Sequence, residues 1–190
     1  MAPDRKTTVL FADLIGSANL YARAGDAAAQ EAIARCVGKL RQAAASCGGR
    51  VVKAAGDKMM VLVATADAAA DTAVAMHTAV DEFPAVANTR LSLGVGFHYG
   101  PVIQQAEEIF GDTVTLASRL VEQAANGQII ITEETLTLLG PLYRAYARRL
   151  YAIKIKGRSE EVALCEIKPV MSDADLVKCG ATPPRPAARK

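Results

Sequence analysis

Residues 50–63, with the sequence RVVKAAGDKMMVLV, constrain the fold of this chain more than any other segment. Two apolar runs of the β type flank the Gly56-Asp57 step, and this arrangement predicts a hairpin with a tight turn. An aspartate in such a turn ordinarily serves only the turn itself. The hairpin nevertheless places the carboxylate of Asp57 at the end of a sheet, with Lys53 four residues before it.

A second strand also ends in an isolated acid. Residues 7–13 read TTVLFAD, a β-branched and aromatic run that ends at Asp13. Two strands of this kind can set the carboxylates of Asp13 and Asp57 side by side at one sheet edge. Hard cations such as Mg²⁺ are held by sparse carboxylate sites of this kind, with substrate phosphates completing the coordination shell.

Composition narrows the class of protein. A chain of 190 residues with 51% hydrophobic residues has the size of one domain with a substantial core. A net charge of +2, without a basic stripe interleaved with aromatics, argues against nucleic-acid binding. The four cysteines form no CxxC pair, which argues against a zinc site or a disulfide framework and fits a reducing cytoplasm. We find no apolar run of membrane-spanning length and no signal peptide, so we expect a cytoplasmic protein without membrane contact from this segment.

Periodicity and breakers predict the remaining elements. Helices are expected over 26–46, 66–83 and 111–125, and strands over 91–99, 102–105, 128–132, 148–156 and 162–167. The order of strands and helices predicts an α+β fold, a ferredoxin-like sandwich with a mostly antiparallel sheet and helices packed on one face. We expect one domain over 1–170 and a disordered tail or linker over 171–190.

Two further features of the 91–105 segment carry expectations. Gly100-Pro101 is predicted to be a turn between two strands. Gly94 and Gly96 lie on one face, where missing side chains leave room for another backbone or a partner subunit. His98, like His77 in the helix over 66–83, lacks neighbouring metal-ligand spacing, and we interpret both histidines as structural.

Three blocks resemble the class III nucleotidyl cyclases. Residues 11–17, FADLIGS, match the family pattern F-x-D-(I/L)-x-G-(S/F), and residues 53–57, KAAGD, match K-x-x-G-D. Residues 110–120, FGDTVTLASRL, are similar to F-G-D-x-V-N-x-A-x-R-L, with Thr115 where the family usually has Asn. The likeness runs from about residue 6 to about residue 168, and it implies the cyclase fold.

The resemblance implies adenylate cyclase activity: conversion of ATP to 3′,5′-cyclic AMP and pyrophosphate. Asp13 and Asp57, with the backbone carbonyl of Ile15, would hold two divalent cations, Mg²⁺ or Mn²⁺. Arg119 would neutralise charge developing at the α-phosphate. Lys156 is similar to a further phosphate-contacting lysine of the family, and Lys154 is the alternative on the same strand face.

The choice of base follows from the same resemblance. Lys53 would donate to the adenine ring, and Glu108, at the position of a family acid, would accept from its exocyclic amine. This pair favours ATP over GTP, because guanine would need an acid in place of Lys53. Glu107 is an alternative register for the acid, and a solvated loop is the alternative for both. Thr115 is shorter than Asn, so the ribose would be held less well and the cyclase would be slow.

In the family, the two sets of site residues come from different subunits, which implies a head-to-tail homodimer with two shared sites. In this chain, we expect the contacts to involve Gly94, Gly96 and the terminal hairpin. The alternative function is a catalytically weakened cyclase-like domain that acts as a nucleotide-binding or protein-interaction regulatory module. A relative of the diguanylate cyclases is a third interpretation, but no GGDEF-like segment is present. The Pro-rich end indicates that a regulatory domain can follow beyond the C-terminus.

Overall fold

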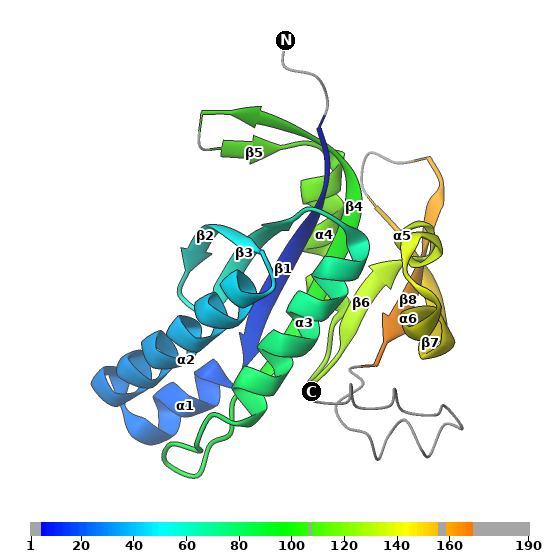
Figure 1. Cartoon of the computed structure of the whole chain (residues 1–190). Coiled ribbons are helices and arrows are strands. Elements are labelled where there is room, and N and C mark those ends of the chain that lie inside the picture. The colour runs from blue at the N-terminus through cyan, green and yellow to red at the C-terminus, as the bar shows by residue number, and fades with distance from the viewer. Residues whose placement is uncertain (1–4, 107, 156–158, 169–190) are drawn as a thin grey trace, which may run out of the picture.

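The computed structural model describes residues 5–106, 108–155 and 159–168 (Figure 1). The strands are β1 (Arg5–Ile15), β2 (Arg50–Ala55), β3 (Lys58–Val63), β4 (Ser92–Gln105), β5 (Glu108–Phe110), β6 (Ile129–Thr132), β7 (Ala147–Lys154) and β8 (Glu161–Ile167). The helices are α1 (Ser17–Ala24), α2 (Asp26–Ser46), α3 (Ala66–Asp81), α4 (Asp112–Gln123), α5 (Glu133–Leu138) and α6 (Pro141–Ala145). Lys156 and the predicted tail over 171–190 lie outside the described residues.

The sheet has the strand order β2-β3-β1-β4-β6-β8-β7, with β5 pairing to β4 beyond this path. Among the described strands, β4 and β6 run parallel and every other neighbouring pair is antiparallel. The predicted α+β fold with a mostly antiparallel sheet is confirmed. β1 lies between β3 and β4, as its apolar sequence indicates, because a strand buried on both faces needs apolar side chains on both.

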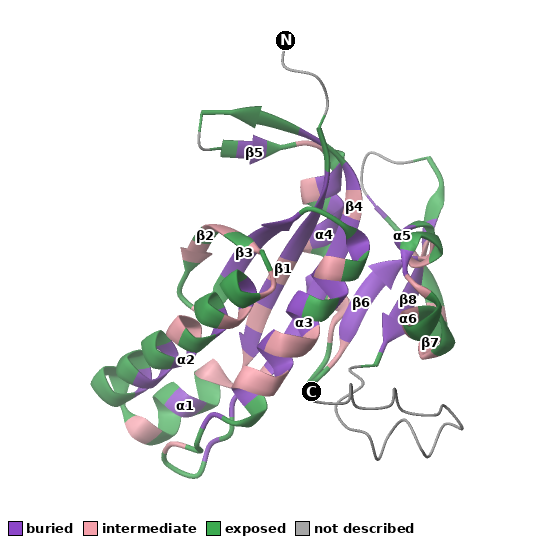
Figure 2. Cartoon of the chain, in the orientation of Figure 1, coloured by how far each residue is buried: buried purple, intermediate pink, exposed green. Residues whose placement is uncertain are grey.

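Each face of the sheet has its own core. On one face, Leu10 and its alternating neighbours in β1 pack with Leu40 of α2 and Met76 of α3. The buried side of α3 is rich in alanine, which lets the helix approach the sheet closely. Figure 1 shows α2 and α3 lying across this face, and Figure 2 shows the outer side of α2 largely exposed and that of α3 only partly exposed.

The opposite face carries α4, so the helices cover both faces rather than one. Val9 of β1 and Met60 of β3 pack there with Ala117 of α4. Gly94 and Gly96, which we expected to admit another backbone or a partner subunit, are covered by this helix. A Cβ on Gly96 would lie 2.2 Å from the backbone nitrogen of Val121. The expected approach of another backbone is confirmed, and the expected dimer contact through these glycines is wrong because α4 occupies the space.

Two local predictions also differ from the structure. Gly100-Pro101 is not a turn, because β4 runs without interruption from Ser92 to Gln105. Pro101 is tolerated in the strand, where it lies opposite Lys6 and its carbonyl oxygen accepts a hydrogen bond of 2.7 Å from Thr113 Oγ1. Helix α1, which we did not predict, fills the segment between β1 and α2.

Both histidines are structural, as expected. Nδ1 of His98 lies 2.9 Å from the hydroxyl oxygens of Thr132 and Thr135, which joins β4 to the start of α5. His77 is buried in α3, and burial lowers the pKa of its imidazole to about 4 although Asp81 opposes this shift. His77 is therefore neutral at pH 7.

Cys36, Cys47 and Cys165 are free thiols in the described part of the chain. Among the described helices, none combines the length and apolar character needed to cross a lipid bilayer.

We predict that Gly96→Ala lowers the free energy of unfolding by about 1–3 kcal/mol, since its Cβ would push into the backbone of α4. Urea unfolding followed by circular dichroism measures this change. Gly38→Ala in α2 is the matched control, because a Cβ there meets no atom within 4 Å. This substitution is expected to stabilise the protein by up to about 1 kcal/mol. A Gly96→Ala variant as stable as the wild type would contradict the close packing of α4.

Candidate active site

Antiparallel pairing of β1 with β3 brings Asp13 and Asp57 to one end of the sheet. Asp13 lies opposite Lys58 in the register, and Asp57 immediately precedes Lys58. The backbone nitrogen of Leu14 donates a hydrogen bond of 3.0 Å to the carbonyl oxygen of Asp57, which fixes the turn against β1. Both carboxylates are half-buried. Ile15, the last residue of β1, lies two positions after Asp13.

The electrostatics of the pair favour a cation. Burial raises the pKa of the Asp13 carboxyl above its ordinary value of 3.8. The ammonium group of Lys58 opposes this rise, and the negative charge of Asp57 adds to it. Two neighbouring carboxylates repel each other when both are ionised. A positive charge bound between them would relieve both the burial cost and the repulsion.

Ser17 connects the turn to the start of α1. Its hydroxyl donates a hydrogen bond of 2.8 Å to Oδ2 of Asp57, across 40 positions of sequence. Gly16 precedes it with φ of 102°, a left-handed conformation that favours glycine, and a Cβ there would lie 3.3 Å from the carbonyl oxygen of Arg90. Helix α1 therefore begins beside Asp57, and its first backbone amides lack partners within the helix.

The motif over residues 11–17 contains Ser17 but does not indicate its contacts. Gly16 is the N-cap residue, and Ser17 is the first residue of α1. The contact of Ser17 with Asp57 depends on the β1–β3 register and on the hairpin turn together, so no local pattern could have indicated it.

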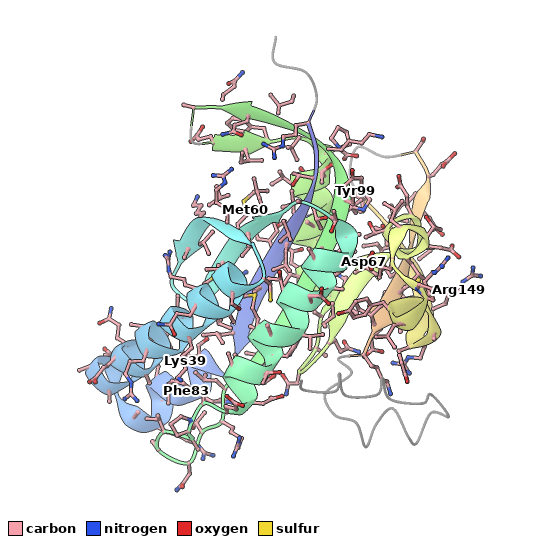
Figure 3. The ribbon with its side chains drawn as sticks, in the orientation of Figure 1. Lys39, Met60, Asp67, Phe83, Tyr99 and Arg149 are labelled. Carbon is pink, nitrogen blue, oxygen red and sulfur yellow. The ribbon has the colours of Figure 1, made fainter. Side chains whose placement is uncertain are left out.

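Two lysines lie on the same sheet face as Asp13. Lys58 faces Asp13 directly, and its Nζ lies 3.5 Å from Oδ2 of that residue. Lys53 on β2 is exposed and lies opposite Met60, which packs on the α4 side of the sheet. Figure 3 labels Met60 on β3, the strand next to the edge strand β2. The hairpin thus places Lys53 on the face that carries the carboxylates.

The remaining candidate residues form a second group along β5 and α4. Glu108 is exposed at the start of β5, opposite Gln105 of β4. Thr115 and Arg119 are both exposed on the outer side of α4, one turn apart. The guanidinium of Arg119 donates a hydrogen bond of 2.8 Å to Glu122, and Thr115 Oγ1 lies 3.5 Å from the carbonyl oxygen of Gly111.

The two groups do not meet within one chain. In the described ranges, neither Thr115 nor Arg119 forms a hydrogen bond or ion pair with Asp13 or Asp57. The outer side of α4 faces away from the sheet, because Leu116 and Ala117 occupy its inner side. Lys156, the remaining candidate, lies outside the described residues.

Comparison with known proteins gives a family for this arrangement. The family model described as the adenylate and guanylate cyclase catalytic domain matches residues 1–166. An adenylate cyclase of Streptomyces coelicolor is 32% identical over 128 residues, which cover 67% of this chain and 32% of that protein. An uncharacterised protein of Mycobacterium tuberculosis is 33% identical over 143 residues, covering 74% of this chain and 34% of that protein. The chain spans about a third of the length of the curated relatives it matches.

Solved structures share the fold. The adenylyl cyclase CyaB from P. aeruginosa aligns with a TM-score of 0.70 at 24% identity, over 90% of this chain and 96% of that chain. The catalytic core of a rhodopsin-guanylyl cyclase with converted specificity, in complex with ATPαS, aligns with a TM-score of 0.77 at 19% identity, over 87% of this chain and 96% of that chain. Adenylyl and guanylyl enzymes therefore share this architecture.

Proposed function

The chain belongs to the family of adenylate and guanylate cyclase catalytic domains, and on that premise we propose that it converts ATP to 3′,5′-cyclic AMP and pyrophosphate. One observation carries the proposal: the half-buried carboxylates of Asp13 and Asp57 lie together beside the start of α1. Charge on a triphosphate can be matched there by bound cations and by the backbone amides of the helix.

The carboxylate pair fits divalent cations, Mg²⁺ or Mn²⁺. Its donors are hard oxygen atoms, and burial together with the charge of Asp57 raises the pKa of Asp13, so a neutralising cation is favoured there. Asp13, Asp57 and the backbone carbonyl of Ile15 would hold the ions. When bound, such ions activate the ribose 3′-oxygen and neutralise the triphosphate.

The reaction joins the ribose 3′-oxygen to the α-phosphorus and breaks the bond from the α-phosphorus to pyrophosphate. Most of the catalysis in phosphoryl chemistry is positioning and charge neutralisation. Arg119 would face the α-phosphate with its planar set of donors, and Lys156 would contact the phosphates. Ser17 orients the carboxylate of Asp57, whose other oxygen is left for the cation.

Adenine is the base that Lys53 and Glu108 would recognise. The ammonium group donates to a ring nitrogen that only accepts, and the carboxylate accepts from the exocyclic amine. Guanine presents a carbonyl and a protonated ring nitrogen at these positions, and each would then face a group of the wrong kind. Lys53 and Glu108 together therefore favour ATP over GTP.

A homodimer with shared sites would unite the two groups of residues. Arg119 and Thr115 are exposed on the outer side of α4, away from the carboxylates of their own chain. The end of β4 after residue 100 together with β5, here termed the arm, exposes the cross-strand pair Ile103 and Phe110. Exposed neighbouring apolar side chains are typical of contact surfaces. These features support a head-to-tail dimer in which each site takes residues from both chains.

We predict cyclic AMP formation from ATP, and less product from GTP, with Mg²⁺ or Mn²⁺. Asp57→Ala is expected to lower the rate at least about 100-fold, because the loss of one carboxylate misplaces the reacting groups. Asp26→Ala, which removes an exposed acid at the start of α2, is the control and should keep full activity. Absence of product from a folded, dimeric wild type would favour the alternative of a regulatory nucleotide-binding or protein-interaction module.

We predict that Thr115→Asn raises the turnover number about tenfold or more. The longer carboxamide can both donate and accept hydrogen bonds toward the ribose, whereas the threonine hydroxyl lies against the carbonyl oxygen of Gly111 at 3.5 Å. Steady-state kinetics with ATP measure the change, and Thr115→Ala is the matched control, expected at or below the wild-type rate. An unchanged or lower turnover of Thr115→Asn would argue against ribose positioning by this residue.

We predict that Asp57→Ala and Arg119→Ala, each inactive alone, recover activity when mixed. Random exchange makes half of the dimers mixed, and each mixed dimer has one intact site of two, so about a quarter of the wild-type rate is expected. Size-exclusion chromatography with differently tagged chains verifies exchange. No recovery after verified exchange would contradict the shared site.

A further inference from the structure

An ammonium group accompanies the carboxylate pair, and none of the roles above uses it. Lys58 opens β3, directly after Asp57 and opposite Asp13 in the register. Opposite residues of an antiparallel pair point to the same face. Nζ of Lys58 accordingly lies 3.5 Å from Oδ2 of Asp13, with the lysine side chain 59% and the aspartate side chain 28% exposed.

The two carboxylates have different partners. Oδ2 of Asp57 accepts a hydrogen bond from Ser17, a neutral donor that orients the group and leaves its negative charge in place. Oδ2 of Asp13 instead faces a full positive charge. One ligand of the proposed cation site thus has a positive charge beside it before any cation binds.

We propose that Lys58 is a resident counter-ion that competes with the divalent cation for Asp13 and turns to the triphosphate when nucleotide binds. The inference rests on the proposed function, since it concerns the same carboxylates. It follows that the cation and the nucleotide bind cooperatively. Without nucleotide, the divalent cation must displace Lys58 from Asp13. Without the cation, Lys58 stays paired with Asp13 and is not available to the triphosphate.

The geometry allows the exchange. A separation of 3.5 Å between partly exposed partners makes a weak ion pair, which is readily broken. The flexible four-carbon stem lets the ammonium group move while the backbone of Lys58 stays paired with β1. A cation at Asp13 would repel the ammonium group, and triphosphate oxygens beside the turn would attract it. By linkage, whatever factor nucleotide adds to cation affinity, the cation adds to nucleotide affinity.

The test measures Mn²⁺ binding directly, by the loss of the free-ion signal in electron paramagnetic resonance. Titrations are run on the full chain without nucleotide and with 3′-deoxy-ATP, which lacks the attacking oxygen. Lys58→Met removes the charge and keeps most of the stem, and Lys58→Arg keeps the charge. Lys39→Met, on the exposed side of α2 (Figure 3), is the control for the same change in net charge.

We expect Lys58→Met to bind Mn²⁺ about threefold to tenfold more tightly than the wild type without nucleotide. The gain in Mn²⁺ affinity that 3′-deoxy-ATP brings should shrink by a similar factor. Lys58→Arg and Lys39→Met should behave as the wild type. Unchanged or weaker Mn²⁺ binding by Lys58→Met, or an equal shift in Lys39→Met, would overturn the inference.

A further variant separates this failure from failure of the proposed function. Asp13→Asn should abolish Mn²⁺ binding at the site. If it does so while Lys58→Met leaves Mn²⁺ affinity unchanged, the counter-ion role is wrong and the cation site stands. If Asp13→Asn binds Mn²⁺ as the wild type does, with and without 3′-deoxy-ATP, both the cation site and the role of Lys58 are overturned.

Discussion

The antiparallel register between β1 and β3 is the constraint on which the rest of the site depends. It sets Asp13 opposite Lys58, and thereby sets the Asp57 turn beside the end of β1. Because side chains alternate along a strand, a slip of one residue would move Asp13 to the α3 face. The buried residues Leu10 and Val61 would then lose their core, which makes the slip costly. Packing of the apolar side chains on the α3 face thus fixes the position of Asp13 on the opposite face.

Much of the fold could be predicted from the sequence because its signals are local. Alternating apolar runs and a Gly-Asp turn predicted β1, β2 and β3, and the helix expected over 26–46 matches α2. The continuous β4 could not be predicted, since Gly100-Pro101 reads as a turn wherever no neighbouring strand is known. The side of the sheet that α4 covers is also a tertiary property. Gly94 and Gly96 indicate that another backbone packs against them, but not that this backbone belongs to α4.

The sequence allowed the residues of the candidate site to be predicted, but not the contacts between them. Asp13 and Asp57 follow from strand ends, and the structure brings them together. The partners of these carboxylates, Ser17 and Lys58, arise from pairing between segments far apart in sequence. Thr115 and Arg119 lie on a helix face directed away from the sheet, so a single chain keeps the two groups of candidate residues apart.

The length of β4 has a mechanical consequence. This one strand of 14 residues, about 45 Å when extended, passes from Ser92 beside Ile15 to the arm. It is hydrogen-bonded along β1 for nearly its whole course. The arm is therefore a direct continuation of the strand that pairs with β1, the strand that carries Asp13. A displacement of the arm by a bound subunit would act on the same β1–β4 hydrogen bonds that hold Asp13 in place.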